Sequence, residues 1–205
     1  MTLAEHLANL GTATVGEVAP AAGLLDGRIR PVGQGVRLAG PARTVRCRPG
    51  DNLALHLAIY KAEVGDVIVA DYNGDTDSGP FGEIMALACQ MRGIAGLVIN
   101  GAVRDSAQIA AMGFPVFARG PNIRGTTKDD RGELDATLDI GGVTIRPGDM
   151  IVADADAILV LPAASVSDTL LAGDRRVANE DRMMARLRAG ETTICILGLD
   201  GETTS

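Results

Sequence analysis

Three charged residues stand out by their types and spacing: Glu83, Arg104 and Asp105. Arg104 and Asp105 follow an apolar run, residues 96–100, that has the pattern of a buried strand. In open α/β folds the chemistry lies beyond the carboxyl ends of such strands. Glu83 follows a glycine-rich loop, at the expected first turn of a helix over residues 82–92, where free backbone N–H groups favour an anion.

Arginine can grip a substrate carboxylate or an enolate oxygen with its planar fork of donors. Aspartate can ligate Mg²⁺, which proteins usually hold through one or two carboxylates, waters and the substrate itself. Glu83, Arg104 and Asp105 together therefore predict a site that holds a divalent cation and an anionic substrate.

Each of these residues also has a purely structural interpretation. Glu83 could simply complement the dipole of its helix. Asp105 could be the N-cap of a helix over residues 106–112, a role that Ser106 could fill equally well. A solvated Arg–Asp pair contributes little energy. Glu180 lies on a charged helix and is most simply part of a solvated face, although in a ring-shaped oligomer it could reach a neighbouring subunit's site.

The sequence offers few other candidate catalytic residues or motifs. His6 and His56 are the only histidines and both lie in helical patterns, which argues against a histidine-based zinc site or triad. Lys128 lies in a polar segment, whereas a Schiff-base lysine needs an apolar strand context. The sequence has no phosphate-binding glycine loop and no nucleophile elbow.

The composition narrows the class of protein. The chain has 205 residues, is 46% hydrophobic and carries a net charge of −7, which argues against nucleic acid or an anionic membrane as the main partner. With 2% aromatic residues and no tryptophan, a surface that stacks bases is not expected. No apolar run is long enough for a membrane span. The three widely spaced cysteines indicate reduced structural thiols and a cytoplasmic protein.

The hydrophobic pattern predicts one mixed α/β domain over residues 1–205, with mixed sheets. Alternation of helices and strands over residues 82–118 indicates parallel pairing, and strands at 36–38, 42–47, 137–145 and 150–161 indicate a second β layer. Thr2 and Glu5 form a capping-box pattern for a helix over residues 2–10, and a second helical start follows at Thr12. The remaining expected elements are a helix at 52–61 capped by Asp51 or Asn52, strands at 97–100 and 114–118, a polar loop at 119–135, a helix over about 166–190 with a charged part near 179–188, and a loose tail at 198–205.

One phrase occurs twice: residues 64–71, Val-Gly-Asp-Val-Ile-Val-Ala-Asp, return in similar form at residues 147–154. The simplest interpretation is that this sequence pattern is typical of any tight Gly-Asp turn followed by a buried strand. The alternative is two strands of related geometry packed in one core.

The segments 82–93, 96–105 and 113–119 resemble the RraA-like superfamily, and the resemblance runs from about residue 14 to residue 161. This superfamily contains the class II 4-hydroxy-4-methyl-2-oxoglutarate aldolases and the regulators of ribonuclease E activity. The resemblance implies a three-layer β/β/α swivelling-type fold that assembles as a homotrimer or as a hexamer of two trimers, with sites between subunits.

The resemblance also implies roles for individual residues. Arg104 would bind the pyruvoyl group of the substrate, Asp105 would ligate Mg²⁺ or Mn²⁺, and Glu83 would hold a catalytic water. An adjacent subunit would supply Glu180. Backbone groups of a further set would contact the substrate: Gly82, Glu83, Ile84 and Met85. The aldolases carry aspartate where this chain has Glu83, so the carboxylate here stands one methylene further out.

The expected activity is therefore that of a divalent-metal-dependent lyase. It would cleave 4-hydroxy-2-oxo diacids to pyruvate and a 2-oxo acid, and decarboxylate oxaloacetate as a side reaction through the same enolate. The alternative is a non-catalytic RraA-like protein that binds and regulates a ribonuclease. Loop 119–135 carries four basic residues that could tune the acceptor end of a substrate: Arg119, Arg124, Lys128 and Arg131.

Overall fold

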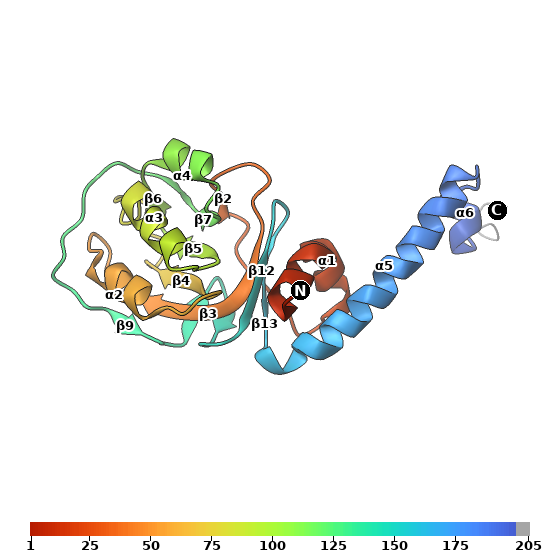
Figure 1. Cartoon of the computed structure of the whole chain (residues 1–205), viewed down its shortest axis with the longest axis horizontal. Helices are drawn as coiled ribbons and strands as arrows, with labels where there is room; N and C mark the ends of the chain where they lie inside the picture. The colour runs from red at the N-terminus through yellow and green to blue at the C-terminus, as the bar shows by residue number, and fades with distance from the viewer. Residues whose placement is uncertain (200–205) are drawn as a thin grey trace.

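The computed structural model of the chain describes residues 1–199, and a nine-stranded mixed sheet dominates that part (Figure 1). Its centre is β3 (Leu38–Arg46), which is followed on one side by the parallel strands β4 (Val67–Asp71), β5 (Gly96–Asn100) and β7 (Val116–Ala118). On the other side lie the antiparallel strands β12 (Met150–Ala153) and β13 (Ile158–Leu161). Short edge strands complete the sheet: β1 (Gly23–Leu24), β2 (Arg30–Pro31) and β9 (Glu133–Leu134).

β3 joins the two halves of the sheet. Residues 38–41 pair with β12, and residues 42–46 pair with β4. The prediction of two strands separated by a turn was wrong, because Gly40 and Pro41 lie inside one continuous strand. Gly40 is needed there because a Cβ would collide with the backbone carbonyl oxygen of Gly65.

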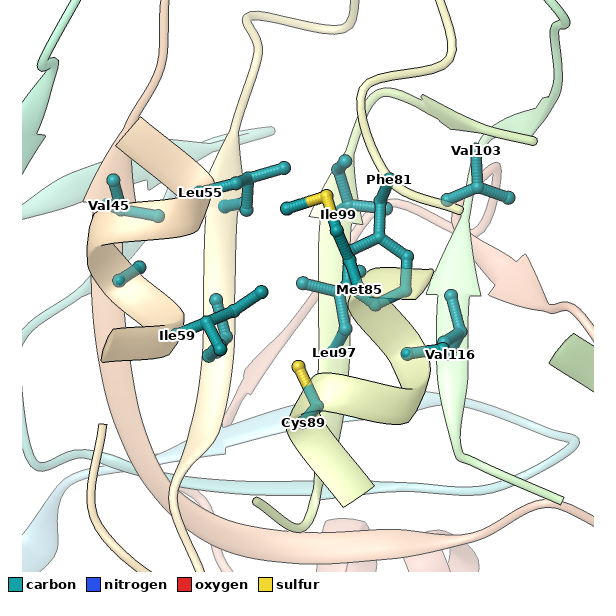
Figure 2. Close-up of a cluster of buried hydrophobic side chains, with 14 of the residues drawn as sticks. Val45, Leu55, Ile59, Phe81, Met85, Cys89, Leu97, Ile99, Val103 and Val116 are labelled. Carbon is teal, nitrogen blue, oxygen red and sulfur yellow. The ribbon is translucent and has the colours of Figure 1, made fainter. Parts of the chain in front are cut away.

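Three hydrophobic clusters define the layers. The first lies between the parallel strands and the helices α2 (Leu53–Lys61), α3 (Glu83–Met91) and α4 (Ser106–Met112) (Figure 2). The second lies between the β4–β5–β7 half of the sheet and the strands β12 and β13, with the hairpin β10 (Leu138–Ile140) and β11 (Val143–Ile145). The third packs α1 (Leu3–Val18) and the start of α5 (Val166–Arg188) against β12 and β13. The three-layer β/β/α prediction is confirmed, with one curled sheet supplying both β layers.

α1 is two helical segments joined at a kink. Thr2 and Glu5 form the predicted capping box. Gly11, with φ of 77°, interrupts the helix, and the side chain of Asp154 then caps the second segment by accepting hydrogen bonds from the N–H and hydroxyl of Thr12, at 2.8 and 2.6 Å. The second helical start at Thr12 is confirmed.

Several element boundaries differ from the expectation. The strand expected over 137–145 is a hairpin that turns at Gly141 and Gly142, both with positive φ, a pair that favours two-residue hairpin loops. The strand expected over 150–161 is likewise two strands, β12 and β13. The helix expected over about 166–190, with its charged part, is α5, and the short helix α6 (Thr193–Leu197) follows it. Of the expected tail, residues 200–205 lie outside the described residues.

The repeated phrase forms the same turn twice. Gly65 and Gly148 both have positive φ, and the side chains of Asp66 and Asp149 each accept a hydrogen bond from the N–H three residues earlier, at 2.9 and 2.8 Å. The strands that follow, β4 and β12, flank β3 on opposite sides. Both interpretations of the repeat therefore hold.

The thiols of Cys47 and Cys89 are buried in the first cluster, and burial raises the pKa of each to about 12. Cys195 is exposed on α6. Within residues 1–199, no helix combines the length and the apolar character that crossing a bilayer requires.

Candidate functional site

The segment before α3 and the segment after β5 run side by side and carry the predicted site. Phe81 forms a parallel bridge with Val103, which lies in β6 (Ala102–Val103). The N–H of Arg104 donates to the carbonyl oxygen of Phe81 at 2.8 Å. This pairing sets Arg104 and Asp105 beside the first turn of α3, so both lie next to the backbone of Glu83.

Asp105 turns its carboxylate away from its own helix. It occupies the N-cap position of α4, but its side chain makes no capping hydrogen bond there. Its Oδ2 instead accepts from the N–H of Glu83 at 3.1 Å and lies 3.7 Å from the Nε of Arg104. The structural interpretation of Asp105 as the side-chain cap of α4 is therefore wrong.

The backbone of Asp105 is part of this arrangement. Its φ of 54° and ψ of 36° place it in the left-handed region, which is uncommon for residues other than glycine and is tolerated best by asparagine and aspartate. Strain of this kind, of about 1 kcal/mol or more, persists where the surrounding structure enforces it and is frequent at functional sites.

Two glycines leave room for the two side chains. A Cβ at Gly82 would lie 2.5 Å from the Oδ2 of Asp105 and 2.9 Å from the Cγ of Arg104. A Cβ at Gly79 would collide with the carbonyl oxygen of Asn122 and approach the Cβ of Arg104 to 3.1 Å. Any side chain at position 82 would enter the site, so glycine at this position leaves room for Arg104 and Asp105.

The first turn of α3 offers fewer free amides than expected. The N–H of Glu83 is bonded to Asp105, and the N–H of Met85 donates to the carbonyl oxygen of Gly82 at 3.1 Å. Within residues 1–199 the N–H of Ile84 has no protein acceptor, so it is the amide of this turn that a substrate could use. The side chain of Met85 is buried, whereas that of Ile84 is 82% exposed.

The side chains of the site are partly open to solvent. Those of Arg104 and Asp105 are 38% and 40% exposed, and Glu83 is exposed. The Oδ1 of Asp105 makes no hydrogen bond within residues 1–199. A small anion can thus reach the guanidinium while the outer carboxylate oxygen remains open to a cation.

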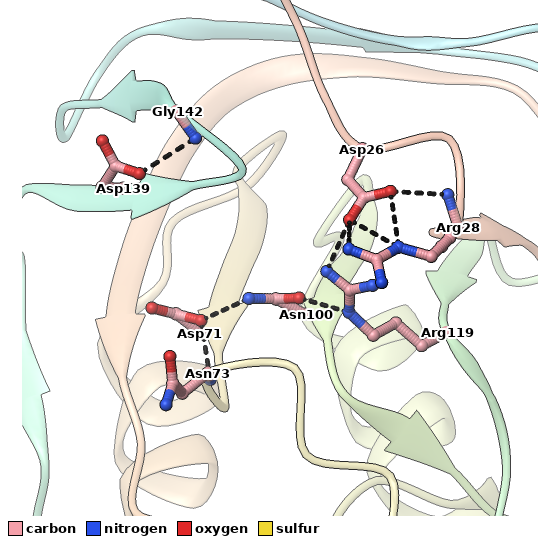
Figure 3. Close-up of polar contacts among 8 residues, drawn as sticks. All are labelled: Asp26, Arg28, Asp71, Asn73, Asn100, Arg119, Asp139 and Gly142. Atoms are coloured by element: carbon pink, nitrogen blue, oxygen red, sulfur yellow. Dashed lines mark hydrogen bonds and ion pairs between the residues drawn. The ribbon is translucent and has the colours of Figure 1, made fainter.

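Sequence reasoning missed a buried polar network at the same edge of the sheet (Figure 3). The side chain of Asn100 donates to Asp71 at 2.7 Å and accepts from the Nε of Arg119 at 2.5 Å, and Arg119 also pairs with Asp26 at 2.9 Å. The guanidinium and N–H of Arg28, and then Arg119, hold the pKa of Asp26 well below its usual range.

This network corrects the expectation for Arg119. Its side chain is 11% exposed and is engaged with Asn100 and Asp26, so it braces the strand ends and is not free to meet a substrate. Its position directly after β7, like that of Arg104 beyond β5, is the sequence signal that could have separated it from the other basic residues of the loop.

Comparison with known proteins gives the family of the chain. The family model described as RraA-like, Aldolase/RraA, matches residues 12–160. The chain belongs to the RraA-like family.

Relatives of this RraA-like chain include curated proteins and solved structures. A Halalkalibacterium halodurans protein named "Putative 4-hydroxy-4-methyl-2-oxoglutarate aldolase" is 39% identical over 165 residues, which are 80% of this chain and 77% of that protein. An uncharacterized Pseudomonas syringae pv. tomato protein is 26% identical with a TM-score of 0.83, covering 93% of this chain and 90% of that one. The RNA-processing inhibitor RraA of Thermus thermophilis is 28% identical with a TM-score of 0.69, covering 74% and 92%.

The residues of the candidate site fit an open divalent-cation site and not a preformed cage. Within residues 1–199, no three side chains of histidine, cysteine, aspartate or glutamate cluster as a preformed metal cage. A single open carboxylate at Asp105, held by the backbone N–H of Glu83, fits Mg²⁺ or Mn²⁺, since Mg²⁺ keeps several waters and takes further oxygens from its substrate. The donor set suits such a cation and does not suit zinc, which prefers nitrogen and sulfur ligands.

Glu180 lies apart from the other predicted residues within one chain. It sits on α5, where it pairs with the Nε of Arg176 at 2.8 Å. Figure 1 shows α5 passing α1 and projecting away from the layer that holds α3 and α4. Glu180 can join Glu83 and Arg104 only if it comes from a neighbouring subunit.

Proposed function

We propose that this RraA-like chain is a divalent-metal-dependent lyase that cleaves 4-hydroxy-2-oxo diacids of the 4-hydroxy-4-methyl-2-oxoglutarate type to pyruvate and a 2-oxo acid. The observation that carries the proposal is the carboxylate of Asp105, turned away from its own helix and held beside Arg104 by the N–H of Glu83. The name of the 39% identical relative supports the same reaction class.

In the proposed mechanism Asp105 holds Mg²⁺ or Mn²⁺, which when bound supplies Lewis-acid stabilisation to the 2-oxo acid group. The guanidinium of Arg104 grips the anionic end of the substrate and lies where negative charge grows on the enolate oxygen. The N–H of Ile84 adds a backbone donor at the helix N-terminus.

Glu83 and a neighbouring carboxylate move protons. A water held by Glu83 accepts the proton of the C4 hydroxyl. The C3–C4 bond then breaks, C4 becomes the carbonyl of the leaving 2-oxo acid, and the electron pair stays as the pyruvate enolate, whose C3 takes up a proton. Oxaloacetate loses CO₂ through the same enolate, so its decarboxylation is the expected side activity.

The proposed enzyme is a ring of identical subunits, a trimer or a hexamer of two trimers. On α3, Ile84, Leu87 and Met91 are 82%, 48% and 78% exposed and share the face next to the site, and large exposed apolar faces usually meet a partner. The projecting part of α5 also exposes Met184 and Leu187. We place the α5 arm of one subunit near α3 of the next, which brings Glu180 to the site as a proton-transfer group.

Incubation of the protein with oxaloacetate and Mg²⁺ tests the reaction. We expect pyruvate from the wild type, loss of pyruvate on chelation and recovery on adding Mg²⁺. Arg104→Ala should lower kcat/KM by about a hundredfold or more, as removal of a donor that acts in the transition state does. Arg37→Ala, at an exposed arginine immediately before β3, is the matched control. Absence of pyruvate from the wild type, or equal rates for the two variants, contradicts the proposal.

Mixing two inactive variants tests the shared site. Arg104→Ala and Glu180→Ala subunits should each be inactive alone, while mixed rings recover about one quarter of wild-type activity, because random assembly pairs an intact Arg104 with an intact Glu180 at that fraction of interfaces. No recovery in rings shown to be mixed would exclude Glu180 from a shared site.

A non-catalytic regulator of a ribonuclease is the second candidate, and the similarity to the Thermus thermophilis inhibitor favours it. Turnover and partner binding separate the two functions. Retention of a ribonuclease on the immobilised protein, unchanged by Arg104→Ala and without turnover of any 2-oxo acid, would support the regulator.

A further inference from the structure

Asn52 is a buried residue that contacts the segment preceding the site. Its side chain is 3% exposed, at the N-terminus of α2. Its Nδ2 donates to the carbonyl oxygen of Pro80 at 2.9 Å and lies 3.8 Å from the Sδ of Met85. Pro80 immediately precedes Phe81, whose carbonyl oxygen accepts the N–H of Arg104. The amide of Asn52 therefore fixes the segment on which Arg104 depends.

Asp51 holds a second loop against the same segment. Its Oδ2 accepts from the hydroxyl of Thr127 at 2.5 Å and from the N–H of Asp129 at 2.7 Å. The loop held in this way returns to the site, because the carbonyl oxygen of Arg124 accepts the N–H of Gly79 at 2.9 Å. The adjacent side chains of Asn52 and Asp51 thus form hydrogen bonds to the two loops beside the site, Asn52 to Pro80 and Asp51 to the loop at 127–129.

Asn52 places a polar side chain in buried surroundings. Within residues 1–199 its Oδ1 is buried without a hydrogen-bond partner, which is unfavourable. It lies beside Met85, a member of the first hydrophobic cluster. A leucine would avoid the unpaired oxygen, so the bond from Nδ2 to Pro80 is the feature that only the asparagine provides.

We propose that Asn52 is a positioning residue: its hydrogen bond to Pro80 sets the spacing between the N-terminus of α3 and the Arg104–Asp105 pair. Its effect on turnover rests on the proposed lyase function, whereas its effect on the geometry does not.

Asn52→Asp is the decisive variant because it has nearly the same shape. The protonated carboxyl can donate to Pro80, but the ionised form cannot and repels the carbonyl oxygen. Burial and the facing carbonyl should raise the pKa of the new carboxyl above its ordinary range. Relative to wild type, kcat should therefore fall by about tenfold or more between about pH 5 and pH 8, with a smaller change in KM, because misplaced catalytic groups lower the rate steeply. Asn52→Leu should lower kcat at every pH.

Thr44→Val is the matched control. The Oγ1 of Thr44 is also buried without a partner within residues 1–199, but Thr44 lies in β3 and holds neither loop. This variant should keep the wild-type kcat and pH profile. A pH profile for Asn52→Asp that parallels the wild type overturns the proposal, as does a loss of rate in Asn52→Leu that follows lost thermal stability alone.

Amide hydrogen exchange keeps the two proposals distinguishable. The protection of the Arg104 and Gly79 amides should fall in Asn52→Asp at high pH and remain unchanged in Thr44→Val. If the wild type turns over no 2-oxo acid, the lyase proposal fails and the exchange result alone decides the positioning role. Unchanged protection in both Asn52 variants overturns it.

Discussion

Adding a single methyl group at Gly82 should disable the site while leaving the fold intact. Gly82 has φ of −146° and ψ of −171°, an extended conformation that alanine adopts without strain. The change in Gly82→Ala is therefore the Cβ alone, which would lie 2.5 Å from the Oδ2 of Asp105 and 3.0 Å from the Nε of Arg104.

The structure gives the size of the displacement. An ordinary contact needs about 3.4 Å, so the carboxylate oxygen must move by about 0.9 Å and the guanidinium nitrogen by about 0.4 Å. This shift also breaks the bond from the N–H of Glu83. Misplacement by about 1 Å can lower a rate by about a hundredfold, equivalent to about 2.7 kcal/mol of transition-state stabilisation.

Stability should change little. The displaced side chains are 38% and 40% exposed and can move toward solvent, and replacing glycine with alanine lowers the entropy of the unfolded chain. We expect a change in the free energy of unfolding of less than about 1 kcal/mol.

The assay is pyruvate release from oxaloacetate at saturating Mg²⁺, with thermal unfolding measured on the same samples. Gly125→Ala is the control, because no atom lies within 4 Å of a Cβ there and its φ is not positive. We expect full activity from Gly125→Ala and a loss of about a hundredfold from Gly82→Ala. Wild-type activity in a folded Gly82→Ala protein would refute the assignment of Arg104 and Asp105.

Three further outcomes follow from the same structure. Arg104→Lys should recover little of the activity lost in Arg104→Ala, because an ammonium group lacks the planar fork that binds a carboxylate; the measurement is kcat/KM for oxaloacetate. Burial alone would raise the pKa of Asp51, but the hydrogen bonds from Asp129, Thr127 and Leu53 outweigh it and hold the pKa at about 2. Because this folded-state pKa lies below the unfolded value of about 3.9, the stability that Asp51 contributes is present above about pH 4 and is lost toward pH 2; urea unfolding should show the deficit of Asp51→Asn shrinking over that window. Gly40→Ala should destabilise the protein by about 1–3 kcal/mol, since the added Cβ meets backbone that cannot move freely; unchanged urea unfolding would contradict the account of β3.

Local sequence determined the elements whose signals are local. The capping box at Thr2 and Glu5, the Gly-Asp turns before β4 and β12, and α4 between Asp105 and Gly113 all formed as expected. Each depends on hydrogen bonds or backbone angles within a few residues. The meeting of Glu83 with Arg104 and Asp105 was also foreseeable, because a helix N-terminus and a strand end lay in adjacent α/β units.

Tertiary structure decided the elements with competing local signals. Gly40 and Pro41 would favour a turn, yet β3 runs through them because β12 and β4 pair with its two halves. Asp51 and Asn52 were both expected as caps for α2, and Asp51 does accept the first N–H of that helix, from Leu53. Only packing showed that its other oxygen holds the Thr127 loop, and that Asn52 makes no cap and turns to Pro80.

The sequence by itself thus determined which side chains could perform the chemistry and on which elements they lie, since residue type and periodicity are properties of the chain. Only the tertiary structure decided the direction of each polar side chain: Asp105 toward Glu83 and not its own helix, and Arg119 into a buried network and not toward solvent. The physical reason is that a polar group can satisfy its hydrogen bonds locally or at long range, and the choice depends on partners that are distant in sequence and close only in the folded chain.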